Sequence, residues 1–252
     1  GFLVQQMLEA MSEEFESSVF ISPEQKRAMI KSIFTNYYQS HSEREIIFDT
    51  SRRWCCKLSI IEGLFPSAKV ICCVRNIAWI MDSIERLTRN NAFDISRLFF
   101  SSAERNTVYS RTEALSQSDR LVGFAYNAFK EAFYSEDSDK LLIVDYEVLT
   151  ENPAETMKII YQFIGEEYFE HDFNNVQYEE PEFDRRLNTK GLHKVRSKVE
   201  YQPRDTILPP DLFEQFSRWS FWTEAGKSKA TIIATKPKET SLLKILDANT
   251  SS

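Results

Sequence analysis

The sequence predicts an α/β protein in which a parallel β-sheet is flanked by helices. Three short apolar segments have the length of strands, namely Glu45–Phe48, Val70–Val74 and Lys140–Asp145. Longer segments with helical periodicity separate them, and this alternation is typical of a parallel sheet with crossover helices. The segment Val70–Val74 is apolar on both faces, which predicts a central strand covered by helices on both sides.

Length and composition are those of a soluble globular protein. The chain has 252 residues, of which 42% are hydrophobic and 27% charged, so we expect one α/β domain over residues 1–222. Residues 223–252 are rich in Lys, Thr, Ser and Ala and are expected to form a mobile tail. A net charge of −7 argues against a nucleic-acid partner, and no apolar stretch approaches the roughly 20 residues that span a bilayer.

The cysteines predict neither a metal site nor disulfides. They occur as two adjacent pairs, Cys55-Cys56 and Cys72-Cys73, and the chain has only three histidines. Neighbouring strand residues point to opposite faces, so an adjacent pair cannot act as one clamp. Reduced cysteines, and a helical start at Phe2 without the features of a secretory signal, predict a cytoplasmic location.

The helices follow from periodicity and from their start and stop signals. In the first forty residues, Ser22 is a plausible N-cap with Pro23 at the first helical position. Gly165 is expected to end the helix that Pro153 opens. The other expected helices cover Lys57–Leu64, the segment after Arg75, Ser110–Tyr134 and Pro210–Trp219.

Two residues near the second strand can bind an anion. Arg75 follows Val74 directly, and the carboxyl edge of a parallel sheet is where α/β proteins bind ligands. Ser83 lies eight residues further on, about two turns into the next helix. A guanidinium and a hydroxyl at one rim can hold a phosphate by charge-assisted hydrogen bonds.

This segment resembles the 3′-phosphate-binding motif of sulfotransferases that use 3′-phosphoadenosine 5′-phosphosulfate (PAPS). In that family an Arg, usually followed by Asn or Asp, ends a strand, and a helical Ser follows eight residues after the Arg. Arg75, Asn76 and Ser83 stand at these positions. The alternative is a strand end in which Asn76 only caps the helix and Ser83 is an ordinary serine.

Two further segments resemble the same family. Leu141–Gly165 resembles its strand ending in Tyr-Glu-Asp-Leu, with Val148 and Ile164 as departures, and the resemblance implies that Tyr146 contacts adenine. The loop with Lys190 and Gly191 resembles the basic loop that covers the 3′-phosphate. Lys194 and Arg196 would add positive charge to it, although a solvated loop explains these residues equally well.

The resemblance also places catalytic residues after the strand Glu45–Phe48. Sulfuryl transfer needs an acceptor oxygen in line with the sulfur, cations that offset charge, and a base. Asp49 is a candidate base and Arg52, or its neighbour Arg53, a candidate stabiliser, while His193 is a second candidate base. Asp49 could instead cap the next helix or pair with an arginine.

The resemblance covers roughly Glu45–Trp222 and looks closest to the bacterial-type sulfotransferase domain. It implies a fold like that of P-loop NTPases, without metal, in which the chain as given lacks the first strand and the 5′-phosphosulfate loop, because no Ser/Thr/Gly-rich turn precedes Phe2. The implied reaction moves a sulfuryl group from PAPS, releasing 3′-phosphoadenosine 5′-phosphate (PAP), to a hydroxyl or amine. The acceptor would be a small molecule or carbohydrate.

Two other functions remain open from the sequence. A P-loop-type nucleotide kinase shares the architecture but needs a G-x-x-x-x-G-K-[ST] loop, which this sequence does not contain. A catalytically degenerate binding module would explain the missing loop. The acceptor is unidentified, because its pocket would come from variable loops near residues 90–106 and 166–186, and the oligomeric state is not predicted.

Overall fold

The computed structural model describes residues 1–178, 180–224 and 226–234. The chain divides into two compact units, Gly1–Ala68 and Lys69–Ser252, and each is described by itself.

A parallel sheet forms the centre of the second unit, as predicted. Its strands are β1 (Val70–Val74), β2 (Leu141–Asp145) and β3 (Thr231–Ile233), in the order β1-β2-β3. Both neighbouring pairs are parallel, and Val74 lies opposite Asp145 in the register. The carboxyl ends of β1 and β2 therefore meet at one edge of the sheet.

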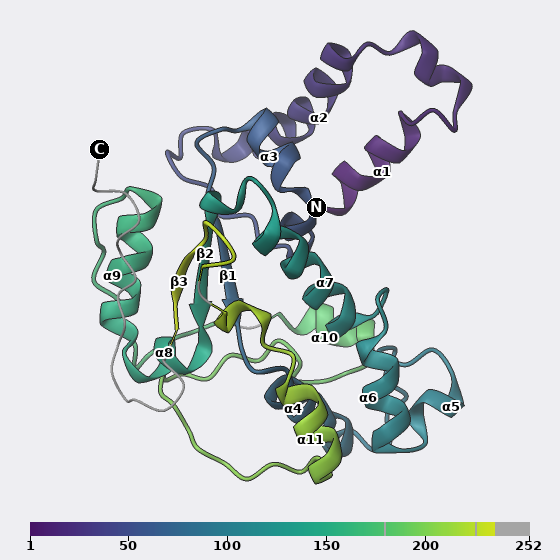
Figure 1. Ribbon diagram of the computed structural model, residues 1–252, viewed down its shortest axis with the longest axis vertical. Coiled ribbons are helices and arrows are strands. Elements are labelled where there is room, and N and C mark those ends of the chain that lie inside the picture. Colours follow the sequence, from purple (N-terminus) through teal and green to yellow (C-terminus); the bar gives the residue numbers. More distant parts are fainter. Residues whose placement is uncertain (179, 225, 235–252) are drawn as a thin grey trace. The chain divides into compact units, whose positions relative to one another are not determined.

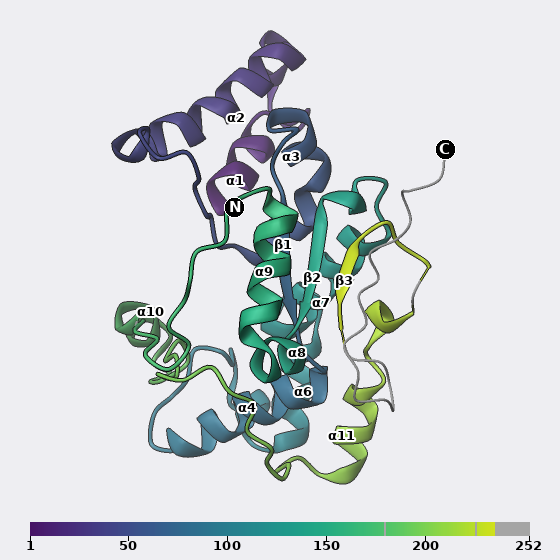
Figure 2. The same ribbon diagram turned by 90° about the vertical axis from the view of Figure 1, so that its left-hand side faces the viewer.

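Helices cover both faces of this sheet. Helix α9 (Pro153–Ile164) lies on one face and α7 (Leu121–Tyr134) on the other (Figures 1 and 2). Leu142 and Val144 of β2 share a buried cluster with Ile160 of α9. Since alternate strand residues point to opposite faces, Leu141 and Ile143 point away from α9. The α/β class with a sheet between helices is thus confirmed.

The predicted central position of Val70–Val74 is wrong for the sheet that the structure describes. There β1 is an edge strand, and Cys73 is exposed. The central strand is β2, whose residues Leu141–Val144 have no exposed surface. An apolar run indicates that a strand is shielded from water. It does not indicate which strands pair with it, and so it does not predict its position in the sheet.

The segment Glu45–Phe48 was expected to be a strand, but it forms none in the described structure, and Phe48 is 69% exposed. An apolar tetrapeptide becomes a strand only where a ladder partner accepts its backbone hydrogen bonds.

The expected helix over Ser110–Tyr134 is two helices, α6 (Val108–Ser116) and α7. The chain turns at residues 117–120, where Gln117 leaves the helical region. Thr107 caps α6 by accepting from the Ser110 amide. Periodicity alone did not reveal this break. Gly123 permits close packing of α7 against the end of α6.

The predicted boundary at Trp222 needs correction, because Thr231–Ile233 of the expected tail forms β3. Residues 235–252 of that tail lie outside the described residues. The prediction of a single domain over residues 1–222 stays a prediction.

In the first unit, α1 (Phe2–Ala10) and α2 (Pro23–Tyr37) pack around a core of Val4, Met11, Ile30 and Trp54. The predicted start of α2 is confirmed, because Ser22 accepts from the Gln25 amide and the Gln25 side chain accepts from the Ser22 amide. Among all described residues, no helix combines the length and apolar character needed to cross a membrane. The elements of this unit are α1 (Phe2–Ala10), η1 (Glu16–Phe20), α2 (Pro23–Tyr37), η2 (Gln39–His41), η3 (Arg52–Lys57) and α3 (Leu58–Leu64).

The carboxyl edge of the sheet in the second unit is bordered by α4 (Ile77–Asn90) and α8 (Tyr146–Glu151). Helix α4 packs against α11, with the rings of Trp79 and Phe213 5.1 Å apart. Helix α10 (Pro181–Leu187) is not among the helices that the sequence predicts. The remaining elements are α4 (Ile77–Asn90), α5 (Ser102–Arg105), η4 (Ser138–Lys140), α8 (Tyr146–Glu151), α10 (Pro181–Leu187), α11 (Pro210–Ser217) and η5 (Phe221–Thr223).

Candidate anion-binding site

Arg75 lies at the carboxyl edge of the sheet, in the turn from β1 to α4. Its Nε is 3.3 Å from Oε1 of Glu147, which follows β2. Its Cζ lies 4.1 Å from the ring centroid of Tyr146, a cation–π distance. The structure thus brings together Arg75 and Tyr146, two of the residues predicted to bind the nucleotide.

Ser83 lies two turns into α4, and its hydroxyl has two partners. It donates to the carbonyl oxygen of Trp79 at 2.8 Å and accepts from Nη2 of Arg204 at 2.7 Å. Asn76 caps the helix by accepting from the Ala78 amide at 3.0 Å. The capping role considered for Asn76 is therefore real, and it is compatible with an anion site beside it.

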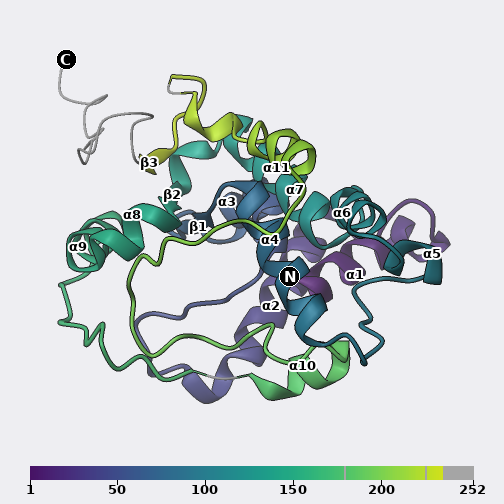
Figure 3. The same cartoon turned by 90° about the horizontal axis from the view of Figure 1, so that it is seen from below.

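Arg204 belongs to the segment between α10 and α11, which crosses this edge of the sheet (Figure 3). An ion pair also joins Arg204 to Asp82, with Nη2 and Oδ2 2.8 Å apart. Its Cζ lies 5.7 Å from the Trp79 ring centroid, and Cζ of Arg75 lies 6.0 Å from the same ring. Both guanidinium groups therefore lie near the Trp79 ring.

Electrostatics at Arg204 favours an anion nearby. Burial lowers the pKa of Arg204. The Asp82 carboxylate opposes this effect, and the positive charges of Arg75, Arg86 and Arg196 lower the pKa further. Its Nε is buried and has no hydrogen-bond partner among the described residues. A phosphate would relieve both the repulsion and the unused donor.

The carboxyl groups of Asp145 and Glu147 lie close together, and that of Glu147 contacts Arg75. Asp145, the last residue of β2, accepts from the Glu147 amide at 2.9 Å. Burial and then the neighbouring Glu147 side chain together raise the pKa of Asp145 to about 7. Glu147 also contacts Arg75, so a phosphate that binds Arg75 competes with this carboxylate.

The predicted basic loop lies at the far end of α4. The side chain of Asn91 donates to the Lys190 carbonyl oxygen at 3.2 Å. Gly191 has a φ of 87°, which favours glycine, and its amide donates to Asp184 at 2.7 Å. In the structure, the basic side chain that contacts Ser83 is that of Arg204. The role predicted for Lys190 and Gly191 stays a prediction.

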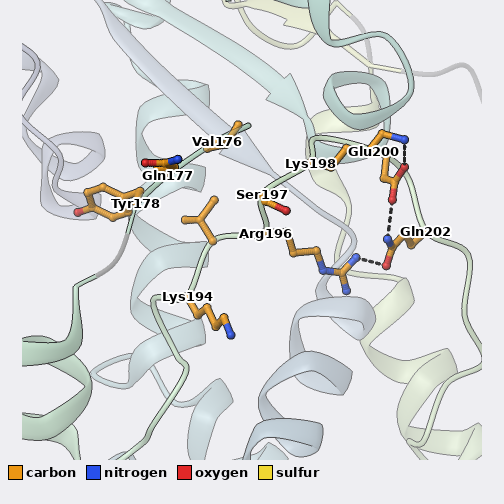
Figure 4. Close-up of a pocket in the computed structure, with 10 residues that line it drawn as sticks. Val176, Gln177, Tyr178, Lys194, Arg196, Ser197, Lys198, Glu200 and Gln202 are labelled. Atoms are coloured by element: carbon orange, nitrogen blue, oxygen red, sulfur yellow. Dashed lines mark hydrogen bonds and ion pairs between the residues drawn. The ribbon is translucent and has the colours of Figure 1, made fainter. Parts of the chain in front are cut away.

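Lys194 and Arg196 line an open pocket of about 680 Å³ beside this edge (Figure 4). Its walls are two extended segments joined by backbone hydrogen bonds, such as that from the Val176 amide to the Ser197 carbonyl oxygen at 2.7 Å. Arg196 contacts Gln202 there. The pocket is lined by Val176, Gln177, Tyr178, Lys194, Val195, Arg196, Ser197, Lys198, Glu200 and Gln202.

The predicted catalytic residues Asp49 and Arg52 belong to the first unit. Asp49 accepts from the Tyr38 hydroxyl at 2.7 Å and from Nε1 of Trp54 at 3.1 Å. Burial lowers the pKa of Arg52, and the charge of Arg53 adds to this effect. The described residues include no cluster of His, Cys, Asp and Glu that could hold a metal ion.

His193, the second candidate base, is held by Asp184. Its Nδ1 lies 2.8 Å from Oδ1 of that carboxylate. Sequence reasoning missed Asp184, as well as Trp79 and Arg204. No local pattern identifies these residues, because each acquires its role from a partner that is distant in the chain or on a helix that was not expected.

The fold and this edge define an α/β protein whose sheet presents a cationic, aromatic-lined site at its carboxyl end. The family model described as Sulfotransferase family matches residues 4–170. This is more than half of the chain, and the protein belongs to the sulfotransferase family. No curated protein and no solved structure matched the chain. The match ends before His193 and Arg204, so their assignment rests on the geometry.

Proposed function

We propose that this sulfotransferase uses PAPS as its sulfuryl donor and binds the 3′-phosphate with Arg75 and Ser83. The supporting observation is that Ser83 and Arg204 share a hydrogen bond of 2.7 Å, while the guanidinium groups of Arg75 and Arg204 both lie near the Trp79 ring. In this proposal Tyr146 contacts the adenine, and Lys190, Gly191, Lys194 and Arg196 belong to the covering loop.

The residues at this edge fit a nucleotide phosphate. Arg204 supplies a buried Nε donor that has no partner among the described residues. Arg75 supplies a guanidinium held by a carboxylate and an aromatic ring, so its direction is fixed before a ligand arrives. Both groups suit forked hydrogen bonds to phosphate oxygens.

PAPS would supply an activated sulfuryl group, and the chain would supply orientation, charge and a base. Candidate groups are Asp49 or His193 as the base and Arg52 as the stabiliser. We propose a small molecule or carbohydrate as acceptor, and neither a nucleic acid nor a membrane as partner. The four free cysteines support a reducing, cytoplasmic compartment as part of the proposal.

Calorimetry with PAP tests the donor assignment. In Arg75→Gln the loss of a charged hydrogen-bonding partner should cost about 1.5–3 kcal/mol, or roughly 10- to 150-fold in affinity. Arg204→Gln should lose affinity for PAP but little affinity for adenosine 5′-monophosphate, which lacks the 3′-phosphate. Arg218→Gln is the matched control, because Arg218 pairs with Glu214 on the surface.

Undiminished affinity for PAP in Arg75→Gln would contradict the assignment. If ATP displaces PAP and binds more tightly, the nucleotide-kinase alternative is favoured instead. If the wild-type protein binds neither nucleotide, a binding module without donor chemistry is the better description.

A further inference from the structure

Glu147, in the first turn of α8, is the acidic partner of Arg75. Its Oε1 lies 3.3 Å from Nε of Arg75, and the exposed fractions are 23% for the Glu147 side chain and 19% for that of Arg75. The two Nη atoms of Arg75 form no hydrogen bond with any described residue. One edge of the guanidinium therefore binds a carboxylate, and its other donors are available to a ligand.

A second carboxyl group lies next to that of Glu147. Asp145 ends β2 and caps α8, with Oδ1 accepting from the Glu147 amide at 2.9 Å. Burial, and then the Glu147 side chain as a hydrogen-bond acceptor and a negative charge, raise the pKa of Asp145 to about 7, although the Glu147 and Val148 amides oppose this. Near neutral pH the two carboxyl groups therefore share a proton for part of the time.

The nearest charged groups lie at the carboxyl edge of the sheet. Arg75 comes from the turn after β1, and its Cζ lies 4.1 Å from the ring centroid of Tyr146 on α8. Arg204, from the segment before α11, lies close enough that the charge of Arg75 lowers its pKa. These two cations and the Tyr146 phenol are the ionisable groups on this side of the carboxyl pair in the described structure.

The other elements that pack against the pair bring no charge to it. In the sheet, Val74 of β1 lies opposite Asp145, and Ile233 of β3 lies opposite Val144. On α9, Glu155 and Lys158 pair with each other on the surface at 2.7 Å. Among the described residues, the cation that contacts the carboxyl pair is therefore Arg75.

A phosphate group bound to Arg75 changes the charge that this pair meets. The phosphate competes with Glu147 for the guanidinium, and it adds negative charge beside two carboxyl groups. Loss of an opposite charge and gain of a like charge both raise the pKa of a carboxyl group. The pair then binds a proton more tightly in the complex than in the free protein, so that ligand binding and proton binding are linked.

We propose that Asp145 and Glu147 act as a proton-linked pair, which takes up a proton from solvent when the 3′-phosphate of the nucleotide binds Arg75. This inference rests on the proposed function. Glu147 is then a specificity-determining residue, because it competes with the phosphate for Arg75 until the pair is protonated. PAPS and PAP carry the same 3′-phosphate, so either one binds with proton uptake, and the proton returns to solvent when PAP leaves.

The linkage fixes the direction of the pH effect. Below the free-state pKa of about 7 the pair already holds its proton. Above this value the proton must come from solvent, so PAP affinity should fall about 5- to 10-fold between pH about 7 and about 8.5. The phosphate groups of PAP contribute little to this change, because their second pKa is about 6.

The first test counts protons. Calorimetric titration of the full chain with PAP at pH about 7.8, in two buffers of different ionisation enthalpy, should show uptake of about half a proton or more per PAP. Adenosine 5′-monophosphate, which lacks the 3′-phosphate, should bind with much less uptake. Equal heats of PAP binding in the two buffers would overturn the linkage, and this wild-type result stands whether or not the variants below fold.

The second test locates the proton. Asp145→Asn keeps the cap of α8, and Glu147→Gln removes the carboxylate that competes for Arg75. Both variants should lose most of the uptake, and their PAP affinity should change less than about twofold between pH about 7 and about 8.5. Glu147→Gln should also bind PAP more tightly than the wild type at the higher pH.

The matched control is Glu151→Gln, because Glu151 is an exposed carboxylate on the same helix. It should take up as many protons as the wild type. Undiminished uptake in both Asp145→Asn and Glu147→Gln would mean that the proton binds elsewhere, and it would overturn the role of this pair.

The proton linkage and the donor assignment fail in different ways. If the wild type binds PAP without proton uptake and with constant affinity over this pH range, the linkage is wrong and the donor assignment stands. If the wild type does not bind PAP, the donor assignment fails and the linkage fails with it.

Discussion

Asp82 is a carboxylate without exposed surface in the middle of α4, next to Ser83. Its Oδ1 accepts from the Ile207 amide at 2.7 Å and the Thr206 hydroxyl at 3.1 Å. Its Oδ2 contacts Arg86 at 2.9 Å and Arg204 at 2.8 Å. At the residue scale, Asp82 fastens the segment with Arg204 onto α4, and the anion site depends on it.

Asp82→Asn should therefore lower the free energy of unfolding by about 2 kcal/mol or more. The amide replaces a charged carboxylate that accepts hydrogen bonds from Arg86, Thr206 and the Ile207 amide. Burial alone would raise the pKa of Asp82, but its hydrogen bonds and Arg204 lower it overall. The stabilisation is then present above the unfolded-state pKa of about 4 and lost as pH falls through the lower folded-state value.

Urea unfolding at several pH values measures this effect. The difference between wild type and Asp82→Asn should shrink below pH about 4. The control is Asp211→Asn, since Asp211 makes a surface contact with Tyr109. Equal stability of Asp82→Asn and wild type at pH 7 would contradict the role given to Asp82.

At the scale of elements, the break between α6 and α7 positions the helix that covers one face of the sheet. Gly123, in the first turn of α7, is buried. A Cβ atom there would lie 2.1 Å from the Gln117 carbonyl oxygen and 2.2 Å from that of Ser116. Both contacts are with backbone, which cannot move aside as a side chain can.

Gly123→Ala should therefore destabilise the fold by about 1–3 kcal/mol or more, as expected for overpacking. Gly63→Ala is a matched control in α3, because a Cβ atom at Gly63 meets nothing within 4 Å. That variant should be stabilised by about 0.5–1 kcal/mol through helix propensity. Thermal unfolding compares them, and a Gly123→Ala protein as stable as wild type would show that α7 can shift.

For the molecule as a whole, the half-buried carboxyl groups of Asp145 and Glu147 link stability to pH. Burial and then Glu147 raise the pKa of Asp145 to about 7, above its unfolded-state value of about 3.9. The folded state then holds the proton more tightly. The contribution of Asp145 is most favourable at low pH and declines as pH rises from about 4 to about 7.

Asp145→Asn removes this titration and keeps an N-cap for α8, since Asn caps as well as Asp. Between pH 5 and pH 8 the wild type should lose more stability than this variant. Urea midpoints across that range test the expectation, with Asp119→Asn, an exposed residue, as control. Parallel curves for wild type and Asp145→Asn would show that Asp145 does not titrate near pH 7.

Features that depend on neighbours along the chain could be predicted from the sequence. It placed β1 and β2 correctly, identified the N-cap of α2 and the Gly165 stop of α9, and located Arg75 at a strand end. These features follow from local apolar patterns, capping chemistry and backbone conformation.

Only the tertiary structure decided which strand is central and which side chains share the site. Ser83 and Arg204 are 121 residues apart, and Asp184 reaches His193 from a helix that the sequence did not reveal. The physical reason is that sequence periodicity records whether a residue avoids water. The partner that a charged side chain meets is set by how distant segments pack.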